Sequence, residues 1–259
     1  MTEGARVEVR IDTRAGGTVG FLTIDNRAKL NALDRALMNE FVGAVDALAS
    51  RVDLRALVVT GAGDKAFIGG ASIPEMAALT RGSARDFITL VHRTCDCLRK
   101  LPVPVIARID GYALGAGLEV AVSCDLRIAT SRSSFGMPET KVGIPSVVEA
   151  ALIPTLIGYG RARELLMLGE IIDADTALRW GLIERAVVPE ALDAEVERII
   201  AALFSAGAQA VRKQKALMQE WENLPTDAAI SAGIDAFARA FETDEPTRML
   251  SDFAKRKRD

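Results

Sequence analysis

Two glutamates beside glycine-rich turns, Glu119 and Glu139, are the residues of this chain best suited to chemistry. Glu119 follows Gly115-Ala116-Gly117, where the apolar pattern changes from strand-like alternation to helical spacing. The first backbone N–H groups of such a helix lack partners and can bind an anion or a developing negative oxygen. This arrangement predicts acid and base catalysis beside an oxyanion site. The alternative is that both glutamates are ordinary surface carboxylates.

The composition excludes several other classes of function. The chain has 259 residues, of which 49% are hydrophobic and only 5% aromatic, which predicts one body with an aliphatic core. A formal net charge of −3 provides no positive field for nucleic acid or an anionic membrane, so neither is an expected partner. With His92 as the only histidine, no metal site or Ser-His-Asp triad is predicted. We expect His92 to be a partly exposed helix residue without a chemical role.

Cysteine usage and hydrophobic runs predict a soluble, cytoplasmic protein. Cys95, Cys97 and Cys124 provide no disulfide framework, so we expect core thiols in a reducing compartment. The first six residues lead into an alternating pattern, which predicts no signal peptide. No run reaches the ~18 apolar residues that a membrane span needs.

The elements that position the two glutamates can be predicted from periodicity. Alternating apolar residues around Gly16-Gly17 predict a hairpin, and Asp34 is a candidate N-cap for the helix that follows. The residues from Leu54 to Thr60 predict a buried strand, and those from Ser83 to Arg99 predict a helix. Later helices are predicted over 147–156, 162–168, 174–180, 191–204, 208–221 and 228–241, with a short strand over 182–188.

Six segments in order along the chain carry a family resemblance. They are Asn26-Arg27 with Leu30-Asn31-Ala32-Leu33, Lys65-Ala66-Phe67 with Gly70-Ala71, Gly111 to Gly117 with Glu119, Cys124-Asp125, Phe135-Gly136-x-Pro138-Glu139, and Ala174 with Gly181-Leu182-Ile183. Together they resemble the enoyl-CoA hydratase/isomerase (crotonase) superfamily over nearly the whole chain. The resemblance implies an α/β fold, a crotonase-like spiral of ββα units with a helical C-terminal trimerisation region.

The resemblance also implies a division of the chain and an assembly. Residues 1–200 are expected to form the core with the CoA and acyl site. Residues 201–259 are expected to form a helical region that oligomerises and covers the active site, in a homotrimer or hexamer.

The resemblance implies roles for individual residues in binding an acyl-CoA thioester. The backbone amides of Ala71 and Ala116 would bind the thioester oxygen, Glu119 would deprotonate the water adding at C3, and Glu139 would protonate C2. No cofactor is implied beyond the coenzyme A that the substrate carries. Its binding is expected from Ala28, Lys29, Leu30, Gly69, Ala71, Ser72 and Ile73, with Lys29 and a tail lysine, Lys255 or Lys257, near the phosphates.

Departures from the family pattern bear on the acyl group. Ser72 stands where aspartate is usual, and Val147, Val148 and Glu149 replace a glycine-glycine-threonine segment that lines the acyl pocket in many hydratases. Their bulk predicts a short or branched acyl group. We expect Glu149 to be an exposed helix residue, with a third pocket carboxylate as the alternative.

The predicted activity is that of a 2-enoyl-CoA hydratase, which adds water across the C2=C3 bond. One alternative is a Δ3-Δ2-enoyl-CoA isomerase, which in this family can work with the Glu139-type residue alone. Another is a non-catalytic acyl-CoA-binding or RNA-binding member. The presence of both glutamates and the acidic balance favour the hydratase.

Overall fold

The chain begins with an antiparallel hairpin that forms one edge of the main sheet. The computed structural model describes residues 4–256. Two predictions fall partly outside the described residues: the absence of a signal peptide, which involves residues 1–3, and the phosphate-binding role of Lys257. Strand β1 (Arg6–Arg14) pairs with β2 (Gly17–Asp25). The hairpin predicted around Gly16-Gly17 is therefore confirmed.

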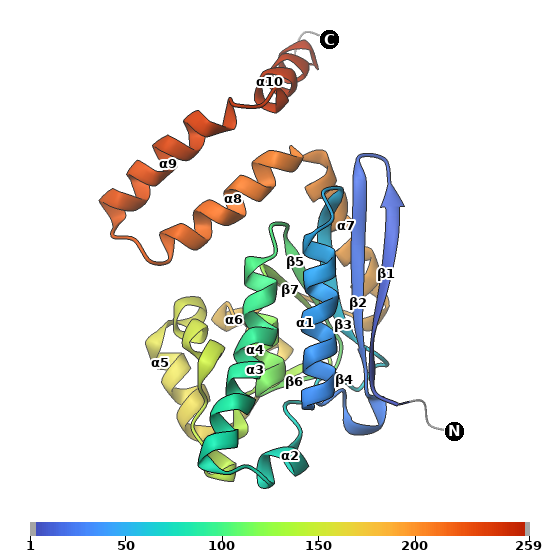
Figure 1. The fold of residues 1–259 in the computed structure, drawn as a ribbon, viewed down its shortest axis with the longest axis vertical. Helices are drawn as coiled ribbons and strands as arrows, with labels where there is room; N and C mark the ends of the chain where they lie inside the picture. The colour runs from blue at the N-terminus through green and yellow to red at the C-terminus, as the bar shows by residue number, and fades with distance from the viewer. Residues whose placement is uncertain (1–3, 257–259) are drawn as a thin grey trace.

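Two sheets are built by a chain that passes back and forth between them (Figure 1). The larger sheet has the order β1-β2-β3-β5-β7-β10, and the smaller one the order β4-β6-β8-β9. Each of the strands β3, β5 and β7 is followed by a short strand of the smaller sheet, and the intervening helices pack outside. This is the expected crotonase-like spiral. The remaining strands are β3 (Leu54–Gly61), β4 (Ala66–Ile68), β5 (Val105–Ile109), β6 (Tyr112–Leu114), β7 (Leu126–Thr130), β8 (Ser134–Gly136), β9 (Ile171–Asp173) and β10 (Arg185–Val187).

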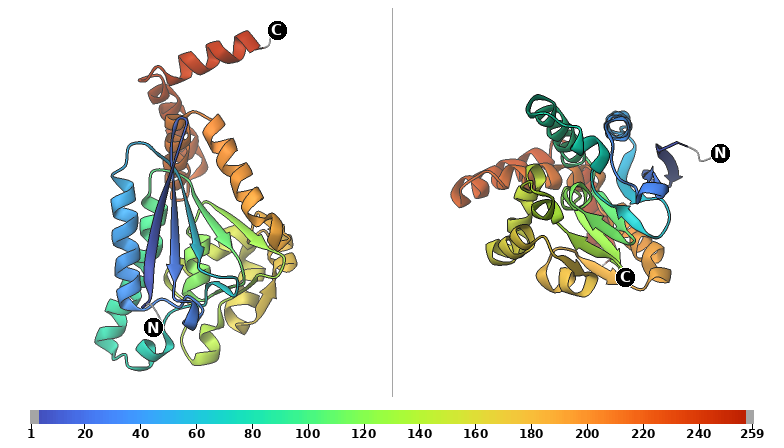
Figure 2. Two further views of the ribbon diagram at one scale, coloured as in Figure 1. Left: turned by 90° about the vertical axis from the view of Figure 1, so that its right-hand side faces the viewer. Right: turned by 90° about the horizontal axis from the view of Figure 1, so that it is seen from below.

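Helices cover both faces of the larger sheet, as the left view of Figure 2 shows. Helices α1 (Arg35–Ala49) and α3 (Arg81–Lys100) pack against each other on one face of the larger sheet. Their buried side chains belong to the larger of the two hydrophobic clusters. Helix α7 (Leu192–Ser205) buries its apolar stripe in a second cluster on the other face. The Asp34 side chain accepts a hydrogen bond from the Leu37 N–H at 2.8 Å, which confirms the predicted N-cap of α1.

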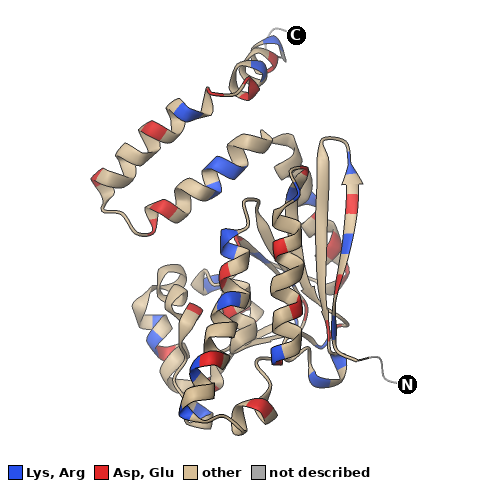
Figure 3. Ribbon diagram, in the orientation of Figure 1, with Lys and Arg blue, Asp and Glu red and all other residues tan. Residues whose placement is uncertain are grey.

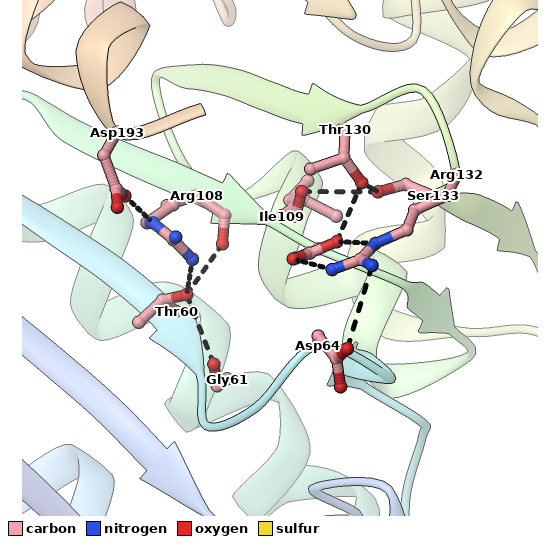
Figure 4. Close-up of polar contacts among 10 residues, drawn as sticks. Thr60, Gly61, Asp64, Arg108, Ile109, Thr130, Arg132, Ser133 and Asp193 are labelled. Carbon is pink, nitrogen blue, oxygen red and sulfur yellow. Dashed lines mark hydrogen bonds and ion pairs between the residues drawn. The ribbon is translucent and has the colours of Figure 1, made fainter. Parts of the chain in front are cut away.

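A polar network fixes the carboxyl ends of β3, β5 and β7 (Figure 4). Asp110, directly after β5, accepts hydrogen bonds from Arg132 at 2.8 and 2.7 Å and from Thr130 at 2.9 Å. The Thr60 hydroxyl donates to the Arg108 carbonyl at 2.9 Å, so β3 and β5 are linked beyond their ladder. Because the chain crosses to the second sheet at this edge, the network also fixes the start of the glycine-rich corners.

The segment after Glu139 differs from the prediction of one helix over 147–156. It contains a 3-10 turn, η3 (Val148–Leu152), followed by α5 (Ile153–Leu168), which has a non-helical residue at Gly158 with φ 76°. Val148 itself has φ 43°, a conformation that a continuous helix does not contain. The other short elements are η1 (Arg27–Lys29), α2 (Ile73–Ala77), α4 (Ala116–Val122), η2 (Pro138–Val142), α6 (Ala174–Trp180) and η4 (Pro189–Ala191).

Three C-terminal helices, α8 (Ala208–Trp221), α9 (Thr226–Ala240) and α10 (Glu245–Arg256), end the chain. The buried Lys215 anchors α8 to the body, since its ammonium donates to the Leu98 and Val103 carbonyls and to Asp125 at 2.8 to 3.1 Å. Helices α9 and α10 project beyond the body, and α9 carries few charged side chains (Figures 1 and 3). None of the helices that the structure describes combines the length and the apolar composition of a membrane span.

Candidate active site

The glycine-rich corner before α4 brings Glu139 close to the start of this helix. Gly115 has φ 52°, which favours glycine, and a Cβ at this position would lie 2.5 Å from Glu139 Oε1. A Cβ at Gly117 would lie 2.0 Å from the carbonyl oxygen of Ile68, so this glycine permits α4 to pack on the end of β4. Each glycine therefore allows a contact that a side chain would block.

Two backbone amides at neighbouring corners have no acceptor within the described chain. Ala116 is the first residue of α4, so its N–H points out of the helix. Ala71 forms a bridge with Leu33, but the bonds of this bridge use the Leu33 and Ser72 N–H groups, at 2.9 and 2.8 Å. The Ala71 N–H is therefore also free. Both residues line the same cavity.

This cavity has a volume of about 900 Å³ and reaches from the Ala71 corner to both glutamates. Its walls come from the α2–α3 segment, the start of α4 and the η2 region with the loop that follows. Glu119 and Glu139 both line it, together with the apolar side chains of Ile73, Met76, Leu79, Phe87, Ile88, Val91, Leu114, Val142, Ile144 and Val147. Two carboxylates and two free amides thus share one largely apolar chamber.

The two glutamates have different environments. Glu119 is 4% exposed, and burial, followed by repulsion from Glu139, raises its pKa to about 8, although the Ala150 amide opposes this shift. Glu139 is half-buried, and its Oε2 accepts a hydrogen bond from the Ser146 hydroxyl at 2.8 Å. Glu119 is therefore not a surface carboxylate. Ser146, which orients Glu139, was not predicted as a site residue, although it directly follows the Ile144-Pro145 loop.

The two segments expected to bind coenzyme A lie side by side. The Gly69 N–H donates to the Leu30 carbonyl at 2.8 Å, and Leu30 and Asn31 adopt left-handed conformations with φ 54° and 56°. The buried Asn31 side chain holds this loop, donating to the Ala62 and Ala66 carbonyls at 3.0 and 2.7 Å. Asn31 belongs to one of the sequence motifs, but its anchoring contact was not predicted.

Only part of the expected coenzyme A set lines the cavity. Gly69, Ala71 and Ile73 do so, whereas Ala28, Lys29, Leu30 and Ser72 do not. Ala28 and Lys29 are exposed on the neighbouring η1 turn, and Ser72 caps α2 by accepting a bond from the Glu75 N–H at 3.5 Å. Lys255 lies on α10, at the opposite end of the molecule from α2 (Figure 1). Within this chain it does not approach the cavity.

Glu149 contradicts its prediction as an exposed helix residue. It is buried within the η3 turn, and its Oε1 lies 2.7 Å from Nδ1 of His92, a residue on α3. The helix position and partial exposure predicted for His92 are correct, since its side chain is 49% exposed. Glu149 and His92 are 57 positions apart, so their pairing was not predictable from local sequence. Glu149 does not line the cavity itself.

The part of the chain that the structure describes contains no group of three or more His, Cys, Asp and Glu residues able to hold a metal ion. The three cysteines are free thiols, with Cys95 and Cys124 buried and Cys97 half-buried.

Comparison with known proteins identifies the fold and then the family. A crystal structure of an enoyl-CoA hydratase from Bacillus anthracis superimposes with a TM-score of 0.90 at 30% identity, covering 96% of both chains. The fold is therefore the mixed α/β crotonase fold, two sheets with C-terminal helices. The family model described as enoyl-CoA hydratase/isomerase matches residues 14–259.

Curated relatives agree with this family over most of their length. The chain is 37% identical over 235 residues to the crotonyl-CoA hydratase of Syntrophomonas wolfei, covering 90% of each. It is 32% identical over 243 residues to the short-chain-enoyl-CoA hydratase of Clostridium acetobutylicum, covering 93% of each. The chain belongs to the enoyl-CoA hydratase/isomerase (crotonase) family.

Proposed function

We propose that this protein is an enoyl-CoA hydratase that adds water across the C2=C3 bond of a short or branched 2-enoyl-CoA thioester. The observation that carries the proposal is the shared cavity, in which the buried Glu119 and the half-buried Glu139 accompany two free backbone amides. Adding water to the conjugated thioester builds negative charge on its oxygen while one proton is removed from water and another is given to carbon. The cavity contains a group suited to each of these tasks.

In the proposed reaction, the amides of Ala71 and Ala116 donate hydrogen bonds to the thioester oxygen and stabilise its enolate character. Glu119 removes a proton from the water while the oxygen of the water bonds to C3, and Glu139 delivers a proton to C2. With a pKa raised to about 8, ionised Glu119 is a stronger base than an ordinary glutamate. The reaction leaves Glu119 protonated and Glu139 ionised. A proton then passes from Glu119 to Glu139, directly or through solvent, which restores both groups for the next turnover.

Substrate binding is proposed to use the two linked loops beside the cavity. The Ala28–Leu30 segment with Lys29, and the corner made by Gly69, Ala71, Ser72 and Ile73, would hold coenzyme A, which the substrate brings with it. Val147 lines the cavity, and its bulk supports the proposal of a short or branched acyl group. The names of the relatives from Syntrophomonas wolfei and Clostridium acetobutylicum support a short chain.

The proposed assembly is a homotrimer or hexamer held by residues 201–259, with residues 1–200 as the acyl-CoA-binding core. Helix α9 supports this division because it has no buried residue among those described. Its apolar stripe is 48 to 71% exposed in the single chain and comprises Ile230, Ile234 and Phe237, continuing to Phe241 just beyond the helix. Such a stripe requires a covering surface, and a second copy of the chain would supply it.

The proposed function is tested by the loss of the enone absorbance of crotonyl-CoA. We expect turnover by the parent and a decrease in kcat of at least ~10²-fold in Glu119→Gln and in Glu139→Gln, because acid and base groups typically contribute ~10²–10⁴. The matched control, Glu190→Gln, changes an exposed glutamate of η4 and should keep parental activity.

Affinity for coenzyme A should be retained in all three variants, since neither cavity glutamate is proposed to bind it. Hydration at the parental rate by Glu119→Gln would refute the assignment. A parent that isomerises 3-enoyl-CoA but does not hydrate crotonyl-CoA would support the isomerase alternative instead.

A further inference from the structure

A buried carboxylate that the proposed reaction does not use lies behind the cavity. The Glu149 side chain is 7% exposed, and its Oε1 lies 2.7 Å from His92 Nδ1. Its Oε2 is buried without a hydrogen-bond partner in the described chain. Burying a carboxylate with one oxygen unpaired opposes folding, so the residue at this position is not explained by stability.

The turn that contains Glu149 contacts the catalytic region on both sides. The η3 turn packs against α3, which carries His92, and against α4, which carries Glu119. The Ala150 N–H donates to the Val147 carbonyl at 3.0 Å and also faces the Glu119 carboxylate, where it favours the charged form. This turn thus places Val147 in the cavity wall and a backbone amide beside Glu119.

The backbone of the turn is strained at the residue before Glu149. Val148 has φ 43°, and a left-handed conformation is unfavourable for a β-branched side chain. Such a conformation persists only where surrounding contacts hold it. The contact between Glu149 and His92 joins the next residue of the turn to α3, so it can supply that restraint.

Several charged and titratable groups surround Glu149. Burial raises its pKa, and the hydrogen bond from His92 opposes this shift. The negative charge of Glu149 in turn contributes to the raised pKa of Glu119. Burial raises the pKa of the neighbouring Cys95 thiol well above its usual range. The groups concerned are His92, Cys95, Asp96 and Arg99 from α3 and Glu119 from α4.

We propose that Glu149, held by His92, is a positioning residue for Glu119: it restrains the η3 turn with the Ala150 amide facing the Glu119 carboxylate, and its negative charge lies behind that carboxylate. The catalytic role of Glu149 rests on the proposed hydratase function, which this inference deepens. The electrostatic coupling between Glu149 and Glu119 does not depend on that function, because it exists in the protein without substrate.

The coupling is tested without turnover, by carboxyl ¹³C NMR titration of protein labelled at glutamate. The Glu119 resonance is assigned by its loss in Glu119→Gln, and in the parent we expect it to titrate near pH 8. Glu149→Gln keeps a hydrogen-bonding group of the same size but removes the charge. It should move the Glu119 titration to lower pH, whereas Glu190→Gln, the exposed control, should leave it unchanged. An unmoved or upward-shifted Glu119 titration in Glu149→Gln would overturn the proposal.

The positioning role is tested by kinetics with crotonyl-CoA. Glu149→Ala and His92→Ala should each lower kcat about tenfold or more with little change in KM, since small misplacements of catalytic groups can cost up to ~10². Glu149→Gln should restore most of the kcat lost in Glu149→Ala. Because the two residues act through one contact, the double alanine variant should lose no more activity than the more affected single variant. Multiplied losses, or parental kcat in Glu149→Ala, would contradict the proposal.

These two experiments separate failure of the inference from failure of the proposed function. A parent inactive towards crotonyl-CoA would refute the hydratase, while the NMR titration would still measure whether Glu149 acts on Glu119. An active parent whose Glu119 titration and kcat are insensitive to Glu149 would refute only the inference.

Discussion

The burial of Glu119 predicts that replacing this residue stabilises the protein at alkaline pH. Its pKa is raised from 4.5 to about 8, first by burial and then by repulsion from Glu139. The folded protein therefore keeps this proton up to about pH 8, whereas the unfolded chain releases it near 4.5. Folded molecules bind more protons between these values, so stability is lost as pH rises through this window.

The magnitude follows from the width of the window. One pH unit corresponds to about 1.4 kcal/mol, so the full effect above pH 8 is about 5 kcal/mol. Between pH 6 and pH 9 alone, the parent should lose about 3 kcal/mol of unfolding free energy from this single group. Glu119→Gln keeps the size of the side chain and cannot ionise, so this loss should be absent.

The prediction is measured by urea unfolding of the parent, Glu119→Gln and the exposed control Glu190→Gln at pH 6 and pH 9. Protein concentration is held fixed, because oligomer formation contributes to apparent stability. We expect Glu119→Gln to lose about 3 kcal/mol less than the parent over this range, and the control to follow the parent. Equal pH dependence in the parent and Glu119→Gln would refute the assignment of a raised pKa to the buried Glu119 carboxyl.

Four further outcomes are expected. For the parent, kcat/KM with crotonyl-CoA should rise with pH towards about 8, as Glu119 ionises, and a flat profile from pH 6 to 8 would contradict its role as base. Gly115→Ala should lower kcat by ~10² or more, because the added methyl meets Glu139 at 2.5 Å and displaces it; crystallography would locate the carboxylate. Asn31→Ala should destabilise the fold by about 2–4 kcal/mol in urea titrations, since it removes buried hydrogen bonds. Phe237→Glu should reduce the mass measured by light scattering, because it places a charge in the apolar stripe of α9 that is proposed to form the subunit interface. An unchanged mass would show that this stripe does not form the interface.

Much of the fold was predictable because its signals are local. The alternating pattern around Gly16-Gly17 and the Asp34 cap each depend on residues close in sequence, and both features are present. The glycine-rich corner before α4 was predictable for the same reason. Gly115 and Gly117 mark the position where a strand turns into a helix, and the structure adds the neighbours that require them.

The environment of Glu149 was not predictable, because it depends on contacts between distant segments. Apolar spacing over 147–156 is compatible with a helix, but the chain instead forms a 3-10 turn with Val148 in a left-handed conformation. The partner that compensates the buried charge, His92, lies on α3. Lys215 is a similar case: its place on an amphipathic helix does not reveal the two carbonyls and the carboxylate that surround its ammonium group.

The spatial core of the proposal is the pair of free amides that share one cavity with the two glutamates. It is tested most directly by a crystal structure of the protein with acetoacetyl-CoA, a stable analogue of the enoyl thioester. We expect the thioester oxygen to lie about 2.7–3.1 Å from the backbone nitrogens of both Ala71 and Ala116, with C3 facing the space between Glu119 and Glu139. A thioester bound with its oxygen away from either amide, or with its acyl group outside the cavity, would contradict the account.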